Sequence, residues 1–491
     1  MTSKSGILIA VILMCFAFNP SMAAKKKKVV ERPDLAAIFS ESKKESLMTK
    51  FKKDADKDAV EEAWRKTIQE HAELAADYNR SRLYKNPNLQ AYVNNLGQSM
   101  VPREANAESL VTFKIINDPV PEVYALATGT VFITTGMISL MENESQLAFV
   151  LAHEAAHVLA NHHLAEIVDN QERMAKTKRT GKILSVVGAV AGAAAASNSD
   201  SAGGLEGAMM GAALFGSGGT GIYGFFSQRG QVKYSRKIET DADSIGLEIA
   251  LRRSYDIRDA EKLVAEMSRV SDSSSPEVGL SFASDSKMLK VRLESLGAHL
   301  AGEFKLAIDE QLAGDGFHLG SPKFNQLMSE LKRDNGLMAL YSDLFIIAKT
   351  NLESAAEIRT DDPVTMYGLG LLYRAVGRTA EERYRTANYF KSAIQFDRGR
   401  SRFPQAHLEY AVELINMEDP TIHNEIQYHL KSYVTLYQRK NGGALPGEMR
   451  FIYDYLELAG DANWVALPVI NTTAQSPNEF TRDLKLSSVS H

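Results

Sequence analysis

The stretch LAHEAAHVLANHH, residues 151–163, limits the possible fold more than any other part of this sequence. Within it, His153, Glu154 and His157 form the pattern H-E-x-x-H. Residues four apart lie on one face of an α-helix, so both imidazoles can point at a single metal ion. Glu154 lies beside the first histidine, where it can accept a proton from an attacking water. The pattern predicts a helix that carries a zinc site, with Glu154 as general base.

The alternative is a helix whose polar residues bind no metal. The motif is surrounded by apolar residues, which predicts that the helix is buried. Unpaired histidines and a glutamate are costly inside a protein, and a metal ion removes that cost. With eleven histidines in 491 residues, the five-residue pattern is expected far less than once by chance. We therefore expect one Zn²⁺ per chain.

A zinc site of this kind needs a third protein ligand and support for its histidines. The best candidate segment is YSRKIETDADSIG, residues 234–246, in which Glu239 and Asp243 are four apart and share a helix face. Glu239 is expected as a metal ligand and Asp243 as the partner of a ligand histidine, while Asp241 is expected on the solvated face. Spacing alone does not choose Glu239 over Glu248.

HEAAH followed by SRKIETDADSIG resembles the zinc metallopeptidase family of the CAAX prenyl protease and the heat-shock protease HtpX. That family pairs H-E-x-x-H with a downstream E-x-x-x-D, and the resemblance covers residues 85–300. It implies a gluzincin-type fold with metal ligands His153, His157 and Glu239 and the base Glu154. It also implies that the strand VFITTG lies beside the cleft and that a substrate adds a strand to that edge.

Two positions depart from that family. Many of its members have a histidine that can cap the zinc, six residues before an arginine; here Ser286 stands in its place, next to Asp285. Either residue is a candidate plug for the metal. Arg292 is present, and we expect it to orient substrate or stabilise the oxyanion, with a surface ion pair as the alternative. Glu122 lies near the position of an asparagine found in the family.

Other polar and aromatic residues near the motifs are assigned less direct roles. We expect His162 and His163 to be exposed residues past the site. Tyr234 is a candidate oxyanion donor, but packing is the favoured role. Tyr124 is expected in the core or the cleft wall.

The first residues predict export. Lys4 precedes the apolar run GILIAVILMCFAF, and Ser21-Met22-Ala23 fits the small-x-small rule for signal peptidase. The run is too short to span a bilayer. Cys15, the only cysteine, lies within it, so a mature chain needs no disulfide, which favours a bacterial periplasm. Lipidation of Cys15 is the alternative, although Met14 precedes it where a small residue is wanted. The positive run Lys25–Lys28 resists translocation and fits export less well.

Length and composition predict several domains of an α+β, mostly α protein. A chain of 491 residues is too long for one core, and a net charge of −5 gives no reason to expect nucleic acid as a partner. Residues 141–163 are predicted as one long helix, with Asn143 and Gln146 as its capping start. We expect the following segments: 1–23, signal peptide; 24–80, charged N-terminal tail and helix; 81–300, zinc metallopeptidase domain; 325–442, tetratricopeptide-like all-α domain; 443–491, C-terminal tail.

Two of these segments leave alternatives open. Residues 181–226 are rich in glycine and alanine, and we favour a soluble helical hairpin over a membrane hairpin. In the later segment, Leu369, Gly370, Tyr373 and Gly377 have tetratricopeptide spacing, and an unrelated helical bundle is the alternative.

The order of signal peptide, peptidase and helical repeats most resembles the BepA-like periplasmic protease-chaperones of the same family. It implies an endopeptidase of outer-membrane protein quality control that acts on unfolded or misassembled envelope proteins. The repeats would hold these clients or contact the outer-membrane assembly machinery. The size of the helical half favours an alternative, a chaperone or assembly factor with a structural or latent zinc site.

Overall fold

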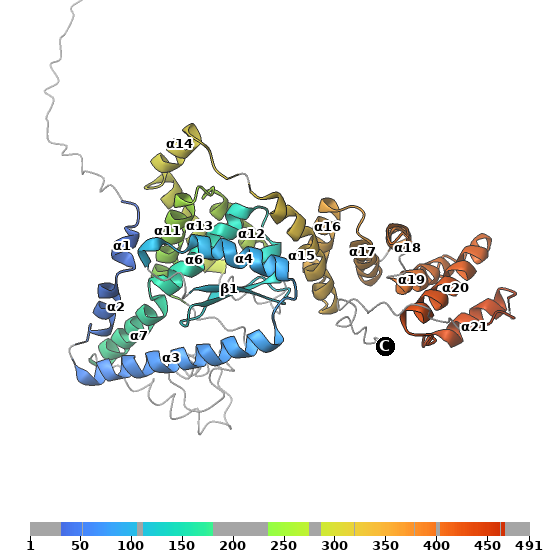
Figure 1. Ribbon diagram of the computed structural model, residues 1–491, viewed down its shortest axis with the longest axis horizontal. Helices are drawn as coiled ribbons and strands as arrows, with labels where there is room; N and C mark the ends of the chain where they lie inside the picture. Colours follow the sequence, from blue (N-terminus) through green and yellow to red (C-terminus); the bar gives the residue numbers. More distant parts are fainter. Residues whose placement is uncertain are drawn as a thin grey trace, which may run out of the picture.

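The computed structural model describes residues 31–51, 53–105, 111–179, 234–273, 286–318, 320–377, 379–398, 403–461 and 463–466. Within these ranges the chain is mostly helical with one small sheet, which confirms the expectation of an α+β, mostly α fold (Figure 1). The expected signal peptide, Lys25–Lys28 and the hairpin at 181–226 lie outside these ranges. None of the helices in these ranges is both long and apolar enough to cross a membrane.

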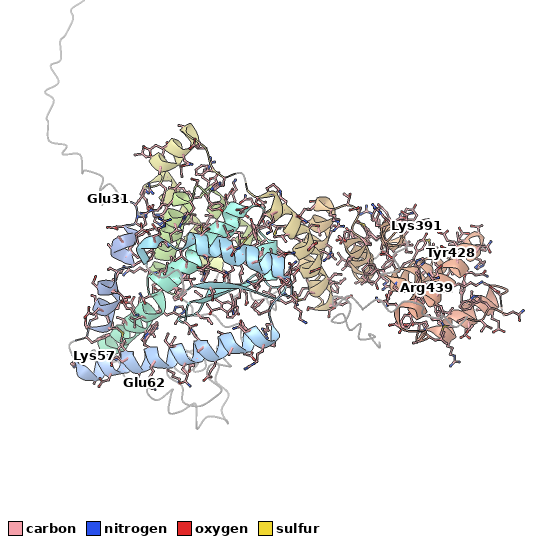
Figure 2. The ribbon with its side chains drawn as sticks, viewed as in Figure 1. Glu31, Lys57, Glu62, Lys391, Tyr428 and Arg439 are labelled. Carbon is pink, nitrogen blue, oxygen red and sulfur yellow. The ribbon has the colours of Figure 1, made fainter. Side chains whose placement is uncertain are left out.

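Three helices open the described chain: α1 (Leu35–Ile38), α2 (Glu41–Met48) and the long α3 (Asp54–Ser81). α2 and α3 pack beside α7 (His162–Arg179), where Val60 of α3 meets Leu164 and Val168 in a small apolar cluster. Figure 2 shows Lys57 and Glu62 on the outer side of α3. The expected charged helix is therefore present, with one face buried against α7.

The sheet follows α4 (Pro87–Met100) and the short 3₁₀ turn η1 (Arg103–Ala105). Its strands are β1 (Thr112–Ile116), β2 (Val123–Ala125) and β3 (Thr130–Thr134), in the order β1-β3-β2. β3 is parallel to β1 and antiparallel to β2. Gly129, with a φ of 89°, turns the chain between β2 and β3, as the sequence predicted.

The two edges of the sheet differ. At β1, polar side chains of α4 take the place of a further strand: Asn94 Oδ1 accepts from Phe113 N at 3.1 Å, and Gln90 bonds both Phe113 O and Ile115 N. The backbone N–H of Tyr84 donates to Ile115 O at 2.9 Å. The opposite edge strand is β2. The expectation that VFITTG forms an edge is wrong, because that segment is β3, in the centre of the sheet.

The motif helix is α6 (Glu144–Leu159), which follows α5 (Thr135–Ser139). The side chain of Asn143 accepts from Gln146 N at 3.0 Å and begins α6, as predicted. The prediction of a single helix up to residue 163 is wrong. The helix is interrupted at Asn161, whose φ is 56°, and α7 starts at His162. This left-handed residue redirects the chain directly after the motif.

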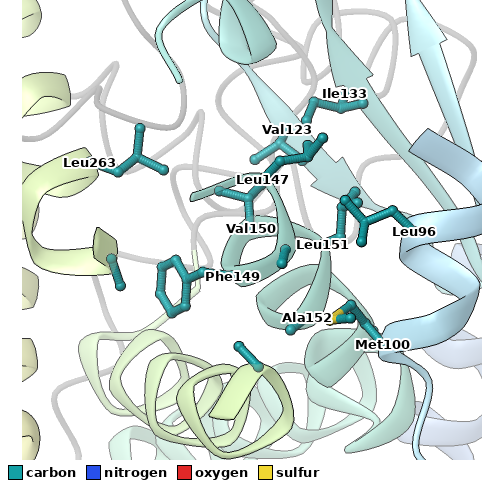
Figure 3. Packing of buried hydrophobic residues seen from close by; sticks show 14 of the residues in the cluster. Leu96, Met100, Val123, Ile133, Leu147, Phe149, Val150, Leu151, Ala152 and Leu263 are labelled. Atoms are coloured by element: carbon teal, nitrogen blue, oxygen red, sulfur yellow. The ribbon is translucent and has the colours of Figure 1, made fainter. Parts of the chain in front are cut away.

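Two helices then cover the motif helix, α11 (Arg236–Arg252) and α12 (Asp259–Ser273). α13 (Ser286–Ala301) packs on both of them and is followed by α14 (Lys305–Ala313). Figure 3 shows apolar residues of α6 packed against α4, the sheet and α12. α11 approaches α6 very closely at Gly246, where an added Cβ would lie 3.1 Å from the His153 backbone. This contact sets how closely α11 packs against α6 at the H-E-x-x-H motif.

α15 (Pro322–Tyr341) joins two hydrophobic cores (Figure 1). Its residues up to Leu331 belong to the core around α6, and its residues from Leu337 on belong to a second, all-helical core. Polar contacts hold the middle of the helix: Tyr84 donates to Asp334 at 2.7 Å, and Asn335 donates to Ser139 Oγ at 3.2 Å. The half that contains the motif helix and the second, helical half therefore share one continuous helix.

The helical half consists of helices that pack in consecutive pairs, α15 with α16, α17 with α18 and α19 with α20. Their bounds are α16 Phe345–Ile358, α17 Pro363–Val376, α18 Ala380–Phe396, α19 Pro404–Ile415, η2 Pro420–Ile422, α20 His423–Lys440 and α21 Met449–Leu458. Gly370 lets α18 approach α17, because a Cβ there would lie 2.5 Å from Phe390. Tetratricopeptide repeats stay a prediction.

One expected tail contains structure. Residues 443–491 were expected as a tail, yet α21 lies within them and buries Ile452 and Leu456 in the second core. The expectation is wrong for this part, because two apolar residues four apart are enough to anchor a short amphipathic helix on a preformed helical surface.

The turn at Asn161 provides a test of the fold around the motif. Asn161→Ala is expected to destabilise the chain by about 1 kcal/mol, because a Cβ-bearing residue without a short polar side chain is strained in the left-handed region. Asn161→Gly is expected to be close to neutral. Urea unfolding midpoints of the three chains measure the difference, and equal losses in both variants would contradict the assignment.

The helical half contains a pH-sensitive pair. His407 Nδ1 and His429 Nδ1 lie 2.8 Å apart, and burial lowers the pKa of each imidazole from 6.5 to about 4, with the neighbouring His407 adding to the effect on His429. Because the unfolded chain binds protons first, stability present above pH 6.5 is lost as the pH falls toward 4.

We expect the thermal unfolding midpoint of the helical half to fall by several degrees between pH 7 and pH 4.5. His407→Asn/His429→Asn is expected to weaken this dependence. Calorimetry of both chains across that range is the measurement. Equal slopes in the two proteins would contradict the role given to the pair.

Candidate metal centre

Two elements bring three metal-ligating side chains together. His153 and His157 lie one turn apart on α6, and Glu239 lies in the first turn of α11. The two Nε2 atoms are 3.1 Å apart, and Glu239 carboxylate oxygens lie 3.6 Å from His153 Nε2 and 3.9 Å from His157 Nε2. One ligand atom from each residue falls within 4.8 Å of the others. Among the described residues this is the one such group.

The surroundings favour the protonation states that a metal needs. Both histidines are buried, and burial, assisted by neighbouring histidines, holds the pKa of His157 well below its usual value. Neutral imidazole is the metal-binding form. Glu239 is less buried, with 15% of its side chain exposed, so the site opens at this ligand. Two imidazoles and one carboxylate are one of the donor sets found in catalytic zinc sites, which leave a fourth position for water or substrate.

Glu154 is a buried carboxyl beside the ligands. Burial raises its pKa to about 7; Glu239 adds to this, while His153, Arg292 and the Ala125 backbone oppose it. A carboxyl with a pKa near neutrality can both accept and return a proton at physiological pH. Ala125 is the last residue of β2, so the base lies against the edge strand of the sheet.

Asp243 and Arg292 form a buried ion pair behind His153. Asp243 Oδ1 lies 3.0 Å from His153 Nδ1, and Arg292 donates from Nε and Nη2 to the two Asp243 oxygens at 3.0 and 2.6 Å. Arg292 Nη1 also lies 3.6 Å from Glu239 Oε2. Burial alone would raise the pKa of Asp243, but Arg292 and His153 outweigh it and lower the pKa to about 2.

This geometry changes the expected part of Arg292. The alternative of a surface ion pair is wrong, because only 2% of the side chain is exposed. Its guanidinium is occupied by Asp243 and Glu239, so it holds a ligand and a ligand's partner in place. The spacing of Glu239 and Asp243 on one helix face indicated half of this network, but nothing in the sequence tied it to Arg292 on α13.

His162 and His163 were expected to be exposed, and this is wrong: both are buried. His162 Nδ1 lies 3.1 Å from His157 Nδ1, and the Tyr234 hydroxyl contacts the His163 ring at 2.9 Å. The Tyr234 ring stacks on His157, with centroids 4.2 Å apart. Tyr234 therefore packs on a ligand, while its hydroxyl is engaged with His163. The break at Asn161 turns these histidines inward.

The remaining candidates lie elsewhere. Glu248 forms ion pairs with Arg32 and Arg252, away from the group of His153, His157 and Glu239. Tyr124 is buried with Tyr78 and Phe132 in a small cluster, as expected for packing. Glu122 is buried at the end of the sheet, where its backbone pairs with Thr134. Asp285 lies outside the described residues, as does the side chain of Ser286.

Comparison with known proteins agrees with this arrangement. The model of peptidase family M48 matches residues 87–312, which span the sheet, α6, α11 and α13. The chain carries a peptidase family M48 domain. The match confirms the resemblance to this metallopeptidase family that the two motifs indicated. It also confirms, for this domain, the expectation of a metallopeptidase. The family is metal-dependent, and His153, His157 and Glu239 of the M48 domain provide a fitting donor set.

Curated relatives carry related names. The chain is 29% identical over 174 residues to the beta-barrel assembly-enhancing protease of Escherichia coli, and 30% over 177 residues to that of Yersinia pestis. It is 26% identical over 246 residues to the mitochondrial metalloendopeptidase OMA1 of Schizosaccharomyces pombe. These matches cover 35%, 35% and 50% of this chain, and 31%, 32% and 60% of the relatives. The similarity to the first two spans about a third of their length.

The buried ion pair can be tested by removing one partner. Arg292→Met leaves the carboxylate of Asp243 buried and uncompensated, which is expected to cost about 3–5 kcal/mol of stability. Arg292→Met/Asp243→Asn removes both charges while keeping an acceptor for His153, and is expected to recover much of that loss. Urea denaturation measures both variants, and a double variant no more stable than the single one would contradict the pairing.

Proposed function

We propose that this protein is a zinc-dependent endopeptidase that hydrolyses peptide bonds. The observation that carries the proposal is the buried group of His153, His157 and Glu239 with Glu154 beside it on the same helix turn. The donor set suits Zn²⁺, which polarises a substrate carbonyl and activates water when bound. The M48 domain supports the same reaction class.

The residues of the chain divide the remaining tasks. Glu154 accepts a proton from the attacking water and returns it to the leaving amine, for which a pKa of about 7 is well placed. Asp243 orients His153 from behind, and Arg292 holds Asp243 and Glu239 in register. Because these charges are buried and mutually paired, the constellation is rigid before substrate arrives.

The edge strand β2 offers a place for the substrate backbone. Extended peptides bind proteases by adding a strand to a sheet edge, and β2 is the edge strand nearest α6. A substrate lying along β2 would pass Ala125, whose backbone already contacts Glu154. The edge at β1 is filled by Asn94 and Gln90, which leaves β2 as the site of strand addition that we propose.

We further propose an exported, periplasmic enzyme of envelope protein quality control. The names of the relatives in Escherichia coli and Yersinia pestis support this setting, as does the signal-like N-terminus. The substrates would be unfolded or misassembled envelope proteins. The helical half would hold them, or contact the outer-membrane assembly machinery, in a tetratricopeptide-like manner.

Cleavage by a matched pair of chains tests the proposed reaction. The zinc-loaded wild type is expected to degrade a permanently unfolded protein, and Glu154→Gln to lose at least about 10³-fold in rate because the base is gone. Gln keeps the size of the side chain, so zinc content should remain one per chain. Full activity of Glu154→Gln at matched zinc would overturn the mechanism.

A second candidate function, a chaperone with a latent metal site, is favoured by one observation. Among the described residues, exposed large apolar side chains gather on the helical half, including Ile346, Tyr384 and Tyr428, which are 56–64% exposed. Figure 2 shows Tyr428 on the outside of this half. Aromatic side chains are the residue type that dominates binding surfaces.

The chaperone candidate predicts that the Glu154→Gln chain suppresses aggregation of an unfolded β-rich protein. Tyr384→Ser/Tyr428→Ser in that background is expected to lose this ability severalfold while zinc binding is unchanged. Leu306→Ser, at a 75% exposed position on the peptidase half, is the control. Equal suppression by all chains would remove the helical half from consideration as the binding surface.

A further inference from the structure

The two ligand histidines are supported in different ways. His153 has the buried carboxylate of Asp243 behind it, and ligand histidines commonly have such a partner. Among the described residues, the partner of the His157 Nδ1 atom is not a carboxylate but Nδ1 of another histidine, His162, at 3.1 Å. The ring planes of His157 and His162 are 82° apart, so the contact joins two nitrogens edge-on and is not a stack.

The second nitrogen of His162 is also engaged. His162 Nε2 lies 3.4 Å from Asp241 Oδ2, and Asp241 stands on α11 two residues after the ligand Glu239. The His162 side chain is only 4% exposed, while that of Asp241 is 51% exposed. A series of side-chain contacts therefore runs from a metal ligand to the surface, through His157, His162 and Asp241.

When His157 binds a metal through Nε2, only one arrangement of the imidazole hydrogens fits these contacts. The His157 ring is neutral, so its hydrogen is on Nδ1 and is donated to His162. His162 must then accept at Nδ1, which places its own hydrogen on Nε2. That hydrogen points at the carboxylate of Asp241, which accepts it. Each donor meets an acceptor, without any added proton.

The interruption between α6 and α7 at Asn161 makes the contact between His157 and His162 possible. In an unbroken helix, residues five apart differ by about 140° around the axis, so His162 would face away from His157. The left-handed Asn161 ends α6 and starts α7 at His162, which folds the imidazole back onto the preceding turn. Tyr234, stacked on His157, closes the face of the same ring.

We propose that His162 is a positioning residue for the metal site: it fixes the ring orientation and tautomer of His157, and Asp241 fixes the tautomer of His162. The proposal rests on the metal site of the proposed function. It gives His157 a histidine–carboxylate support where His153 has a direct carboxylate. A neutral support of this kind holds a ligand without adding another buried charge beside Asp243 and Glu239.

Three substitutions separate the proposed hydrogen bonds from simple packing. His162→Asn places an amide oxygen where Nδ1 stood, so it keeps an acceptor for His157. His162→Leu has nearly the same shape as the Asn variant but no acceptor. His162→Gln places its polar end where Nε2 stood, so it keeps the contact with Asp241 and loses the one with His157.

The experiment measures zinc affinity of each full-length chain by competition with a chromophoric chelator, together with the visible absorption of the Co²⁺-loaded form. Zinc affinity is expected to fall about 10- to 100-fold in His162→Leu and His162→Gln, and less than about threefold in His162→Asn. The Co²⁺ absorption bands are expected to shift in the Leu and Gln variants, because one ligand ring is free to rotate.

Equal zinc affinity of the His162→Asn and His162→Leu variants would overturn the positioning role of His162. Tighter zinc binding by His162→Gln than by His162→Asn would overturn it too. If His162→Leu does not fold, the comparison of Asn with Gln decides the question alone, since both keep a polar side chain. A wild type that binds no zinc would overturn the proposed function as well, whereas wild-type binding with no effect in any variant overturns only this inference.

Discussion

The buried ion pair between Asp243 and Arg292 is the interaction on which the metal centre depends. It joins three helices that are distant in sequence, because Asp243 on α11 faces His153 on α6 and receives Arg292 from α13. A carboxylate that is completely buried requires a partner, and the guanidinium supplies both its charge and two hydrogen bonds. The contacts of this pair hold α11 at a fixed distance from α6. That distance places Glu239 opposite the two histidines.

Close backbone packing makes the pair possible. Gly246 allows α11 to approach the His153 backbone, and only at that depth can Asp243 reach the Nδ1 atom of the ligand. The same approach aligns Asp241 with His162 on the other side of the helix. One helix thus supplies a ligand and the outer supports of both histidines, through residues at positions 239, 241 and 243. The centre is a property of how two helices meet more than of either helix alone.

The sequence predicted the features that depend on local spacing. His153, Glu154 and His157 share a helix turn, the Asn143 cap begins that helix, and Gly129 turns the chain between two strands, all of which short-range rules describe. Features that depend on backbone dihedrals or packing were missed. The left-handed Asn161 buries His162 and His163, and the parallel pairing of β1 with β3 makes β2 an edge strand. α15 serves two cores because its two halves meet different partners, which periodicity alone does not reveal.

The most direct test of this account is the position of zinc in the crystallised full-length chain, located by anomalous scattering on both sides of the zinc absorption edge. The account predicts one strong peak within bonding distance of His153 Nε2, His157 Nε2 and a Glu239 oxygen, with Asp243 outside the coordination sphere. A peak bound by Asp243 or by His162, or no peak between α6 and α11, would contradict it.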